Sequence, residues 1–188
     1  GDVYKRQAYV FSTTDGGATY LQVARLTAAD AASYDDFGRS VAIDGSTVVV
    51  GAYNDGSTGS HDHNGSGSAY VFRTTDGGAT YGQVAKLTAS DAAANDEFGK
   101  SVAIDGNTVV IGAYGDDSYT GSAYVFRTSD GGATYDQVAK LTAADAAAED
   151  KFGNSVAIDG ATIVIGAYKD DDGGDSSGSA YVFEDESG

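Results

Sequence analysis

Residues 68–114 read SAYVFRTTDGGATYGQVAKLTASDAAANDEFGKSVAIDGNTVVIGAY, and residues 122–168 repeat this stretch with only eight differences. An earlier copy runs over residues 8–53, and a further copy begins at residue 179 and matches through residue 183. The Phe-Gly pair recurs after 61 and then 54 residues, and the longer interval holds extra residues around 61–65. A period of this length indicates a repeat architecture, so the fold of one unit decides the fold of the chain.

Each unit contains four short runs rich in β-branched and aromatic residues, separated by clusters of Gly, Asp and Ser. In one copy these runs are residues 40–44, 47–52, 68–73 and 81–88, which we name strands A, B, C and D of a unit. Runs of this kind joined by tight turns predict an antiparallel sheet. The nearly continuous apolar character of strand B predicts burial on both faces, and the polar strand D is expected at the outer edge.

Four-stranded repeats of about 40–55 residues are typical of β-propeller blades, whereas a helical solenoid would need far more helix than this sequence offers. We therefore predict an all-β fold built of propeller blades, each with four antiparallel strands. The expected division is a non-repeat end (1–7), a partial blade with strands C and D (8–30), two blades (31–91 and 92–145), a partial blade with strands A, B and C (146–183) and an acidic tail (184–188).

The expected strands number thirteen, which is too few to close a ring because propellers have at least about four blades. We expect a segment of a larger propeller or an open array within an assembly; the alternative is a ring closed by two chains. The sequence contains no Met, which suggests that the chain is not a complete translation product.

The composition excludes several classes of protein. The chain has 28 acidic and 11 basic residues, a formal net charge of −17, and no Cys. A surface this acidic repels phosphate backbones, so we expect no nucleic-acid partner. No apolar run approaches the ~18 residues of a membrane span, which argues against membrane insertion, and without Cys there is no thiolate metal site or disulfide framework.

Several segments of the repeat resemble the FG-GAP repeat family. In one copy the matching segments are LTASD at 87–91, DEFGKSVAI at 96–104, VVIGAY at 109–114 and GSAYVF at 121–126. The resemblance implies a propeller like the head of integrin α-subunits, usually seven-bladed, with roles in adhesion and surface assembly. It implies an extracellular or cell-surface location and no single activity.

Integrin-type blades carry a calcium loop of the form D-x-D-x-D-G in the hairpin between strands A and B, and this chain departs from that pattern. Its hairpins contain one acidic residue each, at Asp44, Asp105 and Asp159. One carboxylate in a tight turn cannot supply the several oxygen ligands that calcium requires. The usual calcium site of the family is therefore expected to be absent.

A second motif, TTDGGATY at residues 13–20, recurs at 74–81 and, as TSDGGATY, at 128–135. It resembles the Asp-box of sialidases and other propellers, with Tyr in place of Trp, and it falls between strands C and D as an Asp-box does. Because Asp accepts turn amides and Gly adopts positive φ, we interpret the motif as a structural turn. Similarly, we expect the Phe residues at 37, 98 and 152 to fill the gap between neighbouring blades.

In a propeller the B–C and D–A loops emerge on one face. That face would carry 17 of the 28 acidic residues, with only Lys151 and Lys169 as basic residues in those loops. The acidic residues are Asp55, Asp62, Asp116, Asp117, Asp170, Asp171, Asp172 and Asp175 in B–C loops, and Asp30, Asp35, Asp36, Asp91, Asp96, Glu97, Asp145, Glu149 and Asp150 in D–A loops. Charge this dense favours bound cations, with a solvated face of capping residues as the alternative.

We therefore consider a calcium site on this face, with residues 170–175 as the best candidate because closely spaced carboxylates can surround a hard cation. The candidate ligands are Asp170, Asp172, Asp175, Asp116, Asp117, Asp35, Asp96, Asp150, Asp55 and Asp62. For Asp35, Asp96 and Asp150 the alternative is a bond to backbone amides of the crossover between blades. We also predict one helical turn at residues 89–94, capped by Asp91.

Two further features lie in the longest loop. His61 and His63 flank Asp62, but a lone His-x-His in a Gly/Ser loop is more often solvated than metal-bound. Asn64 opens an Asn-Gly-Ser sequon, which would be a glycosylation site in a secreted eukaryotic protein.

A near-perfect repeat places the same groups around a ring, whereas catalysis needs unlike groups at one point. We therefore predict a non-catalytic extracellular structural or adhesive protein, a building block of a surface assembly or filament that associates with other copies of itself. The alternative is a calcium-dependent adhesin module that binds glycans or surface proteins through the acidic face and Tyr114, Tyr119 or Tyr168. A fragment of a propeller glycosidase is a more remote alternative.

Overall fold

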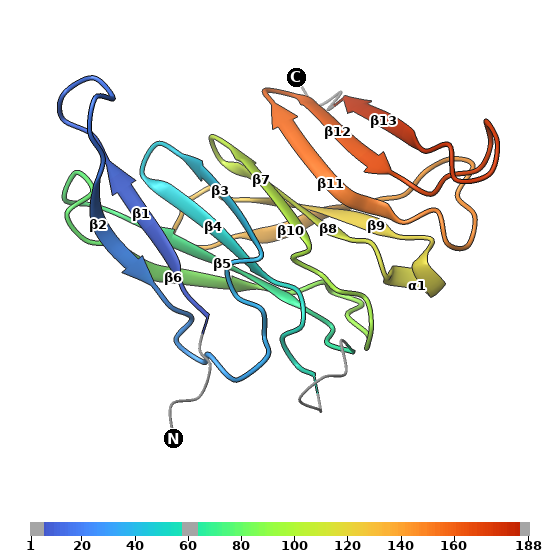
Figure 1. Ribbon diagram of the computed structural model, residues 1–188, viewed down its shortest axis with the longest axis horizontal. Coiled ribbons are helices and arrows are strands. Elements are labelled where there is room, and N and C mark those ends of the chain that lie inside the picture. Colours follow the sequence, from blue (N-terminus) through green and yellow to red (C-terminus); the bar gives the residue numbers. More distant parts are fainter. Residues whose placement is uncertain (1–5, 58–63, 185–188) are drawn as a thin grey trace.

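The computed structural model describes residues 6–57 and 64–184 of the chain. These residues form thirteen strands in four antiparallel sheets that fan out beside one another (Figure 1). The first sheet, a half-blade, consists of β1 (Ala8–Ser12) and β2 (Leu21–Leu26), and the second, blade 1, consists of β3 (Ser40–Asp44), β4 (Thr47–Ala52), β5 (Ser68–Arg73) and β6 (Gly82–Leu87). Blade 2 consists of β7 (Ser101–Asp105), β8 (Thr108–Ala113), β9 (Ser122–Arg127) and β10 (Asp136–Leu141). The last sheet, which we name the open blade, has three strands, β11 (Phe152–Asp159), β12 (Thr162–Ala167) and β13 (Ser179–Glu184).

Each sheet is a meander in which strands pair in chain order, so A, B, C and D run from the inner to the outer edge of a blade. The inner strands of successive blades lie in contact, β3 with β7 and β7 with β11, as expected for blades arranged around an axis. Every residue of β4 is buried, whereas β6 alternates exposed and partly buried residues before the buried Leu87. The predicted all-β fold of propeller blades is confirmed.

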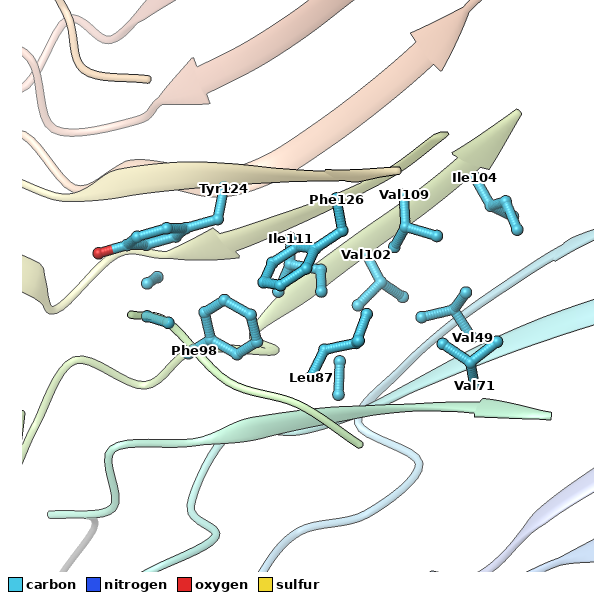
Figure 2. Packing of buried hydrophobic residues seen from close by; sticks show 13 residues of the cluster. Val49, Val71, Leu87, Phe98, Val102, Ile104, Val109, Ile111, Tyr124 and Phe126 are labelled. Atoms are coloured by element: carbon cyan, nitrogen blue, oxygen red, sulfur yellow. The ribbon is translucent and has the colours of Figure 1, made fainter. Parts of the chain in front are cut away.

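The Phe of each Phe-Gly pair lies between two blades. Phe98 is fully buried and packs edge-on against Tyr124 and Phe126 of blade 2, with ring centroids 5.5 and 6.0 Å apart. The same cluster includes Val71 and Leu87 of blade 1 (Figure 2). Burial of large side chains from both blades in one cluster therefore joins neighbouring blades.

The Gly of the pair permits the close approach of two backbones. Gly99 has a φ of +91°, and a Cβ on it would lie 2.3 Å from the carbonyl oxygen of Ser68. Gly153 repeats this arrangement, with a φ of +85° and a Cβ position 2.2 Å from the carbonyl oxygen of Ser122. No side chain fits in this space, so the chain requires Gly at both positions.

The predicted helical turn at residues 89–94 is wrong, because this crossover forms two successive turns. The N–H of Ala92 donates to the carbonyl of Ala89 at 3.3 Å and closes one turn that does not continue as a helix, and Asn95 and Glu97, which follow the predicted segment, have positive φ. Asp91 does not act as the predicted cap: its carboxylate accepts hydrogen bonds from Lys140 and Tyr124 instead.

The joint between blades 1 and 2 and the joint between blade 2 and the open blade use the same polar contacts. Ser40 Oγ donates to the carbonyl of Gly99 at 2.8 Å, and Ser101 Oγ donates to the carbonyl of Gly153 at 2.8 Å. The hairpin residue Asp44 accepts the N–H of Gly106 at 2.7 Å, as Asp105 does for Gly160. The single Asp of each of these A–B hairpins therefore binds the next blade.

The one helix assigned in the described residues, α1 (Asp116–Tyr119), is four residues long and contains non-helical residues. Across those described residues, no helix combines the length and apolar character needed to cross a bilayer.

Candidate functional site

The D–A and B–C loops of each blade lie against one another and form a continuous loop face. The N–H of Asn54 donates to the carbonyl of Asp35 at 3.2 Å, and Gly115 donates to Asp96 at 3.1 Å. The equivalent bond in the open blade joins Lys169 to Asp150. These backbone bonds bring together acidic residues that are about 20 positions apart in the sequence.

In blades 1 and 2 a lysine of strand D lies between the acidic loops. Lys86 Nζ is 2.6 Å from Asp30 and 2.7 Å from Asp55, and it lies 5.4 Å from the centre of the Tyr70 ring. The equivalent set in blade 2 is Lys140, Asp91, Asp116 and Tyr124, with distances of 2.6, 2.7 and 5.3 Å in the same order. Each lysine thus supplies a cation to two carboxylates.

The hydrogen bonds of these sets shift the pKa values of their members. Although burial opposes the shift, the bonds with Asp30 and Asp55 raise the pKa of Lys86, and those with Asp116 and Asp91 raise the pKa of Lys140. Burial also opposes the shift of the acids, yet the hydrogen bonds from Lys86 and Lys140 lower the pKa of Asp30 and of Asp91. Both partners are therefore held in their charged forms at neutral pH.

A count of basic residues within the loops misses these lysines, because they lie on a neighbouring strand. The signal for them is present in the sequence: Arg25, Lys86 and Lys140 occupy one position of strand D in three copies. Each pairs in register with a Tyr of strand C, as Lys86 does with Tyr70. A basic residue that returns at one position of a repeat beside acidic loops predicts an ion pair.

The open blade gathers three carboxylates at the equivalent place. Ligand oxygens of Asp145, Asp170 and Asp172 all lie within 4.8 Å of one another, and we name these residues the acidic triad. The Tyr181 hydroxyl lies 2.8 Å from Asp145 Oδ1 and 2.5 Å from Asp170 Oδ2. Among the described residues, no lysine or arginine pairs with the triad.

Charges and hydrogen bonds within this cluster shift the pKa values of two triad members. The hydrogen bond from Tyr181 lowers the pKa of Asp170, whereas the charge of Asp170, followed by that of Asp145, raises the pKa of Asp172. Several carboxylate oxygens this close together can coordinate a hard cation such as calcium. Two predicted ligands, Asp170 and Asp172, thus lie together with Asp145, which was not among the predicted ligands.

The other predicted ligands lie elsewhere. Asp35, Asp96 and Asp150 are buried, and each accepts the N–H of a residue three positions earlier in its own crossover, at 2.6 to 2.7 Å. Burial raises the pKa of Asp35 and of Asp96 in spite of that bond. This arrangement matches the backbone-amide alternative for the three residues.

Asp55 and Asp116 belong to the lysine sets, and Asp117 and Asp175 are exposed outside the triad. Asp62, with His61 and His63, lies outside the described residues. Asn64 of the sequon is half-buried, and its carbonyl accepts the N–H of Asn95 at 3.2 Å.

The Asp-box-like segments form hairpin turns on the opposite side of the blades from the loop face. Asp76 accepts the N–H of Thr80 at 2.9 Å, the Thr80 hydroxyl at 2.6 Å and the Thr74 hydroxyl at 2.7 Å. These bonds lower the pKa of Asp76, the Thr80 hydroxyl contributing most. Its carboxylate is thus fully used in holding the turn.

Comparison with known proteins agrees with this geometry. The family model described as FG-GAP repeat matches three stretches of the chain, at residues 20–72, 81–126 and 135–183. No curated protein matches the sequence. Each matched stretch includes one Phe-Gly pair together with the strands that it joins. With most of its residues in these three matches and its sheets arranged as blades, the chain belongs to the FG-GAP repeat family.

Proposed function

We propose that the protein is a non-catalytic extracellular building block of a surface assembly or filament, and that it associates with other copies of itself. FG-GAP repeats are typical of extracellular or surface proteins and often serve in adhesion, and the family is generally non-catalytic. The observation that carries the proposal is the repetition of one joint: blade 1 meets blade 2, and blade 2 meets the open blade, through the same Ser and Asp contacts.

A joint that repeats without change produces surfaces that repeat at a fixed spacing, which suits an array. The loop face repeats as well, because the lysine sets of blades 1 and 2 have the same members at nearly the same distances. Side chains of these sets bind one another, which supports a structural role for them.

The test is to image the purified protein by electron microscopy and to follow its mass by analytical ultracentrifugation as the protein concentration rises. The proposal predicts oligomers or filaments of regular spacing that form without added ligand. A monomer at all concentrations that binds members of a glycan array would contradict it.

The acidic triad favours a second function, a calcium-dependent adhesin module that binds carbohydrate or protein. Tyr168 lies in the same B–C loop as Asp170 and is half exposed, so its ring is accessible to a sugar. The ring centres of Tyr53 and Tyr114 instead lie 4.3 and 4.6 Å from Lys100 Nζ, so the lysine occupies one face of each ring.

This second function predicts that calcium raises the melting temperature and that EDTA reverses the effect. A calcium concentration of ten times Kd would add about 1.4 kcal/mol of stability. Asp145→Asn should remove the response, whereas Asp175→Asn, in an exposed residue outside the triad, should retain it. Glycan binding that requires calcium would then favour the adhesin, and its absence would favour the building block.

A further inference from the structure

The copies of the repeat differ most in their B–C loops, which vary in length and in sequence. These loops are residues 54–67, 115–121 and 169–178. In blade 2 the loop includes α1 (Figure 1), where three successive residues, Asp117, Ser118 and Tyr119, have φ values of +47°, +61° and +65°. Residues other than Gly seldom adopt this conformation, and strained residues of this kind cluster at ligand sites. The B–C loop of blade 2 is therefore a candidate for a function that the repeated scaffold does not share.

A cavity of about 670 Å³ lies at this loop, and we name it the loop pocket. It is lined by Asp117, Ser118 and Tyr119, by residues 93–96 of the crossover before blade 2, and by Glu149 of the crossover after blade 2. Every lining residue lies between positions 93 and 149, so neither end of the chain forms part of the pocket. A cavity of this size accommodates a small organic ligand.

Backbone contacts fix the walls of the loop pocket. Gly115 donates its N–H to the carbonyl of Asp96 at 3.1 Å, and Lys151 donates its N–H to the carbonyl of Tyr119 at 2.9 Å. A Cβ on Gly115 would overlap the carbonyl oxygen of Asn95, so these two loops lie in direct contact. Lys151 Nζ also lies 4.8 Å from the centre of the Tyr119 ring. A ligand would therefore meet preformed walls, which lowers the entropic cost of binding.

Four polar side chains at the loop pocket have no partner in the fold. Asn95, Asp117, Ser118 and Glu149 are exposed, and within the part of the chain that the structure describes their side chains form no hydrogen bond or ion pair. The carboxylates of the lysine sets, by contrast, bind their own lysines. The pocket thus offers an amide, a hydroxyl and two carboxylates to a ligand.

The spacing of the acidic side chains indicates a ligand larger than an ion. Among the described residues, only the acidic triad brings oxygens of three carboxylates within 4.8 Å of one another, so Asp96, Asp117 and Glu149 do not share one cation. Carboxylates accept hydrogen bonds from hydroxyl or ammonium groups, while amides and hydroxyls both donate and accept. A polyhydroxyl ligand pairs with all of these groups, and the negative charge of the walls disfavours an anionic one.

We propose that the loop pocket binds a neutral or amino sugar without a metal ion. Asp117 and Glu149 accept hydrogen bonds from hydroxyl or ammonium groups of the sugar. Asn95 and Ser118 donate hydrogen bonds to its oxygens, and Tyr119 supplies an apolar contact. This inference goes beyond the proposed function, because it requires neither calcium nor association between copies.

The test is saturation-transfer difference NMR of the whole protein in EDTA. The probes are the methyl glycosides of glucose, galactose and mannose, with glucosamine as the amino sugar and glucuronate as the acidic one. Saturable binding of at least one neutral or amino sugar is expected, with glucuronate at least about tenfold weaker. No saturable binding of these sugars up to about 50 mM, equal affinity for glucuronate, or binding only after calcium is added would overturn the inference.

Variants of the protein locate the binding. Asp117→Asn removes a charge and keeps a residue type that tolerates positive φ, so it should weaken binding of the neutral or amino sugar about tenfold and narrow the discrimination against glucuronate. Asp171 occupies the same position in the next B–C loop and is exposed outside the pocket, so Asp171→Asn is the matched control that should leave binding unchanged. Equal losses in the two variants would overturn the inference.

Ultracentrifugation of the same samples separates this inference from the proposed function. If no sugar bound while the protein still formed oligomers, the loop pocket would be rejected and the building-block function would stand. If the protein bound sugar in EDTA and stayed monomeric at every concentration, the loop pocket would stand and the building-block function would be rejected.

Discussion

Blade 2 and the open blade start from the same strand C sequence, and they differ in what completes them. In blade 2 the fourth strand buries Tyr124 fully and brings Lys140 to two carboxylates. In the open blade Tyr181 is partly exposed, and its neighbouring carboxylates raise the pKa of Asp172. The comparison shows that strand D supplies a cation to the loop face as well as an edge to the sheet.

The half-blade shows the converse situation. Arg25 occupies the strand D position of Lys86 and pairs in register with Tyr9, but no D–A or B–C loop of its own blade is present among the described residues. Its side chain is exposed. Within the described residues, Arg25 of the half-blade thus has no acidic partners of this kind, and the acidic triad of the open blade has no basic one.

Blades 1 and 2, which have a strand D, are closed blades in this comparison. The largest difference in the free energy of unfolding between a closed blade and the open blade is expected when the last Phe of strand C is replaced. Phe126→Ala should lower the free energy of unfolding by about 3–5 kcal/mol because this side chain is buried between blades. Phe183→Ala, in the same local sequence, should cost less than half as much because Phe183 is only partly buried. Urea denaturation followed by circular dichroism measures both. Equal losses would mean that the open blade is packed as tightly as blade 2.

Replacement of the strand D lysine is expected to cause the next largest loss of unfolding free energy. Lys140→Met removes the cation and leaves the buried Asp116 without its ion-pair partner, which should cost about 1–3 kcal/mol. Arg25→Met is the matched change at an exposed position and should be close to neutral. The same denaturation assay compares them, and a neutral Lys140→Met would show that the ion pair contributes nothing to the blade.

The pKa shifts of Asp172 in the open blade and of Asp91 in blade 2 have opposite directions, so ionisation of the two residues affects stability in opposite ways. The neighbouring charges of Asp170 and Asp145 raise the pKa of Asp172, so its ionised form destabilises the fold above that pKa, and the penalty disappears as pH falls through it. Burial opposes the shift at Asp91, but the hydrogen bond from Lys140 lowers its pKa, so it stabilises the fold above the ordinary value of about 3.9 and loses this effect as pH falls through the lowered pKa.

Asp172→Asn should therefore raise the melting temperature at pH 7, and Asp91→Asn should lower it. The Asp172 difference should shrink as the pH falls through the raised pKa of Asp172 and should be gone near 3.9, the ordinary value for the unfolded chain. The Asp91 difference should shrink only below about 3.9, as the pH falls toward the lowered pKa of Asp91. Differential scanning calorimetry across pH 3–7 provides the measurement. A shift of the same sign for both variants at pH 7 would contradict the assignment of uncompensated charge to the open blade.

The smallest change in stability is expected when the Asp of an A–B hairpin is replaced. Asp44→Ala removes the hydrogen bond to Gly106 of the next blade and should cost about 0.5–1 kcal/mol. Asp159 occupies the same position in the open blade, where the described residues include no following blade, so Asp159→Ala should be neutral. Thermal melts of both variants test whether the hairpin contact contributes at the joint.

Much of the fold was predictable because the hydrophobic pattern and the turn residues agree in every copy. The pattern of strands A to C placed residues 40–44, 47–52 and 68–73 where β3, β4 and β5 lie. The crossover was not predictable from helix signals, because its Ala-rich composition favours helix while tertiary contacts hold Asn95 and Glu97 at positive φ.

The site was only partly predictable for a different reason. Assigning acids to loops located Asp170 and Asp172, but their neighbour Asp145 comes from the preceding crossover and meets them only after the blades pack. The lysines were missed because a side chain on strand D reaches across to loops that contain almost no basic residues. Equivalent positions in a repeat, compared across copies, contain more of this information than any single loop does.

Hydrogen exchange of the three strands that begin with Ser-Ala-Tyr-Val-Phe tests the central claim most directly. Mass spectrometry of the intact fold would compare residues 68–73, 122–127 and 179–184, which form β5, β9 and β13. Blades closed by a fourth strand should protect the first two segments, with the third exchanging at least ~10-fold faster because its outer amides face solvent. Equal protection in all three segments would contradict an open edge at β13, and with it the distinction between closed and open blades.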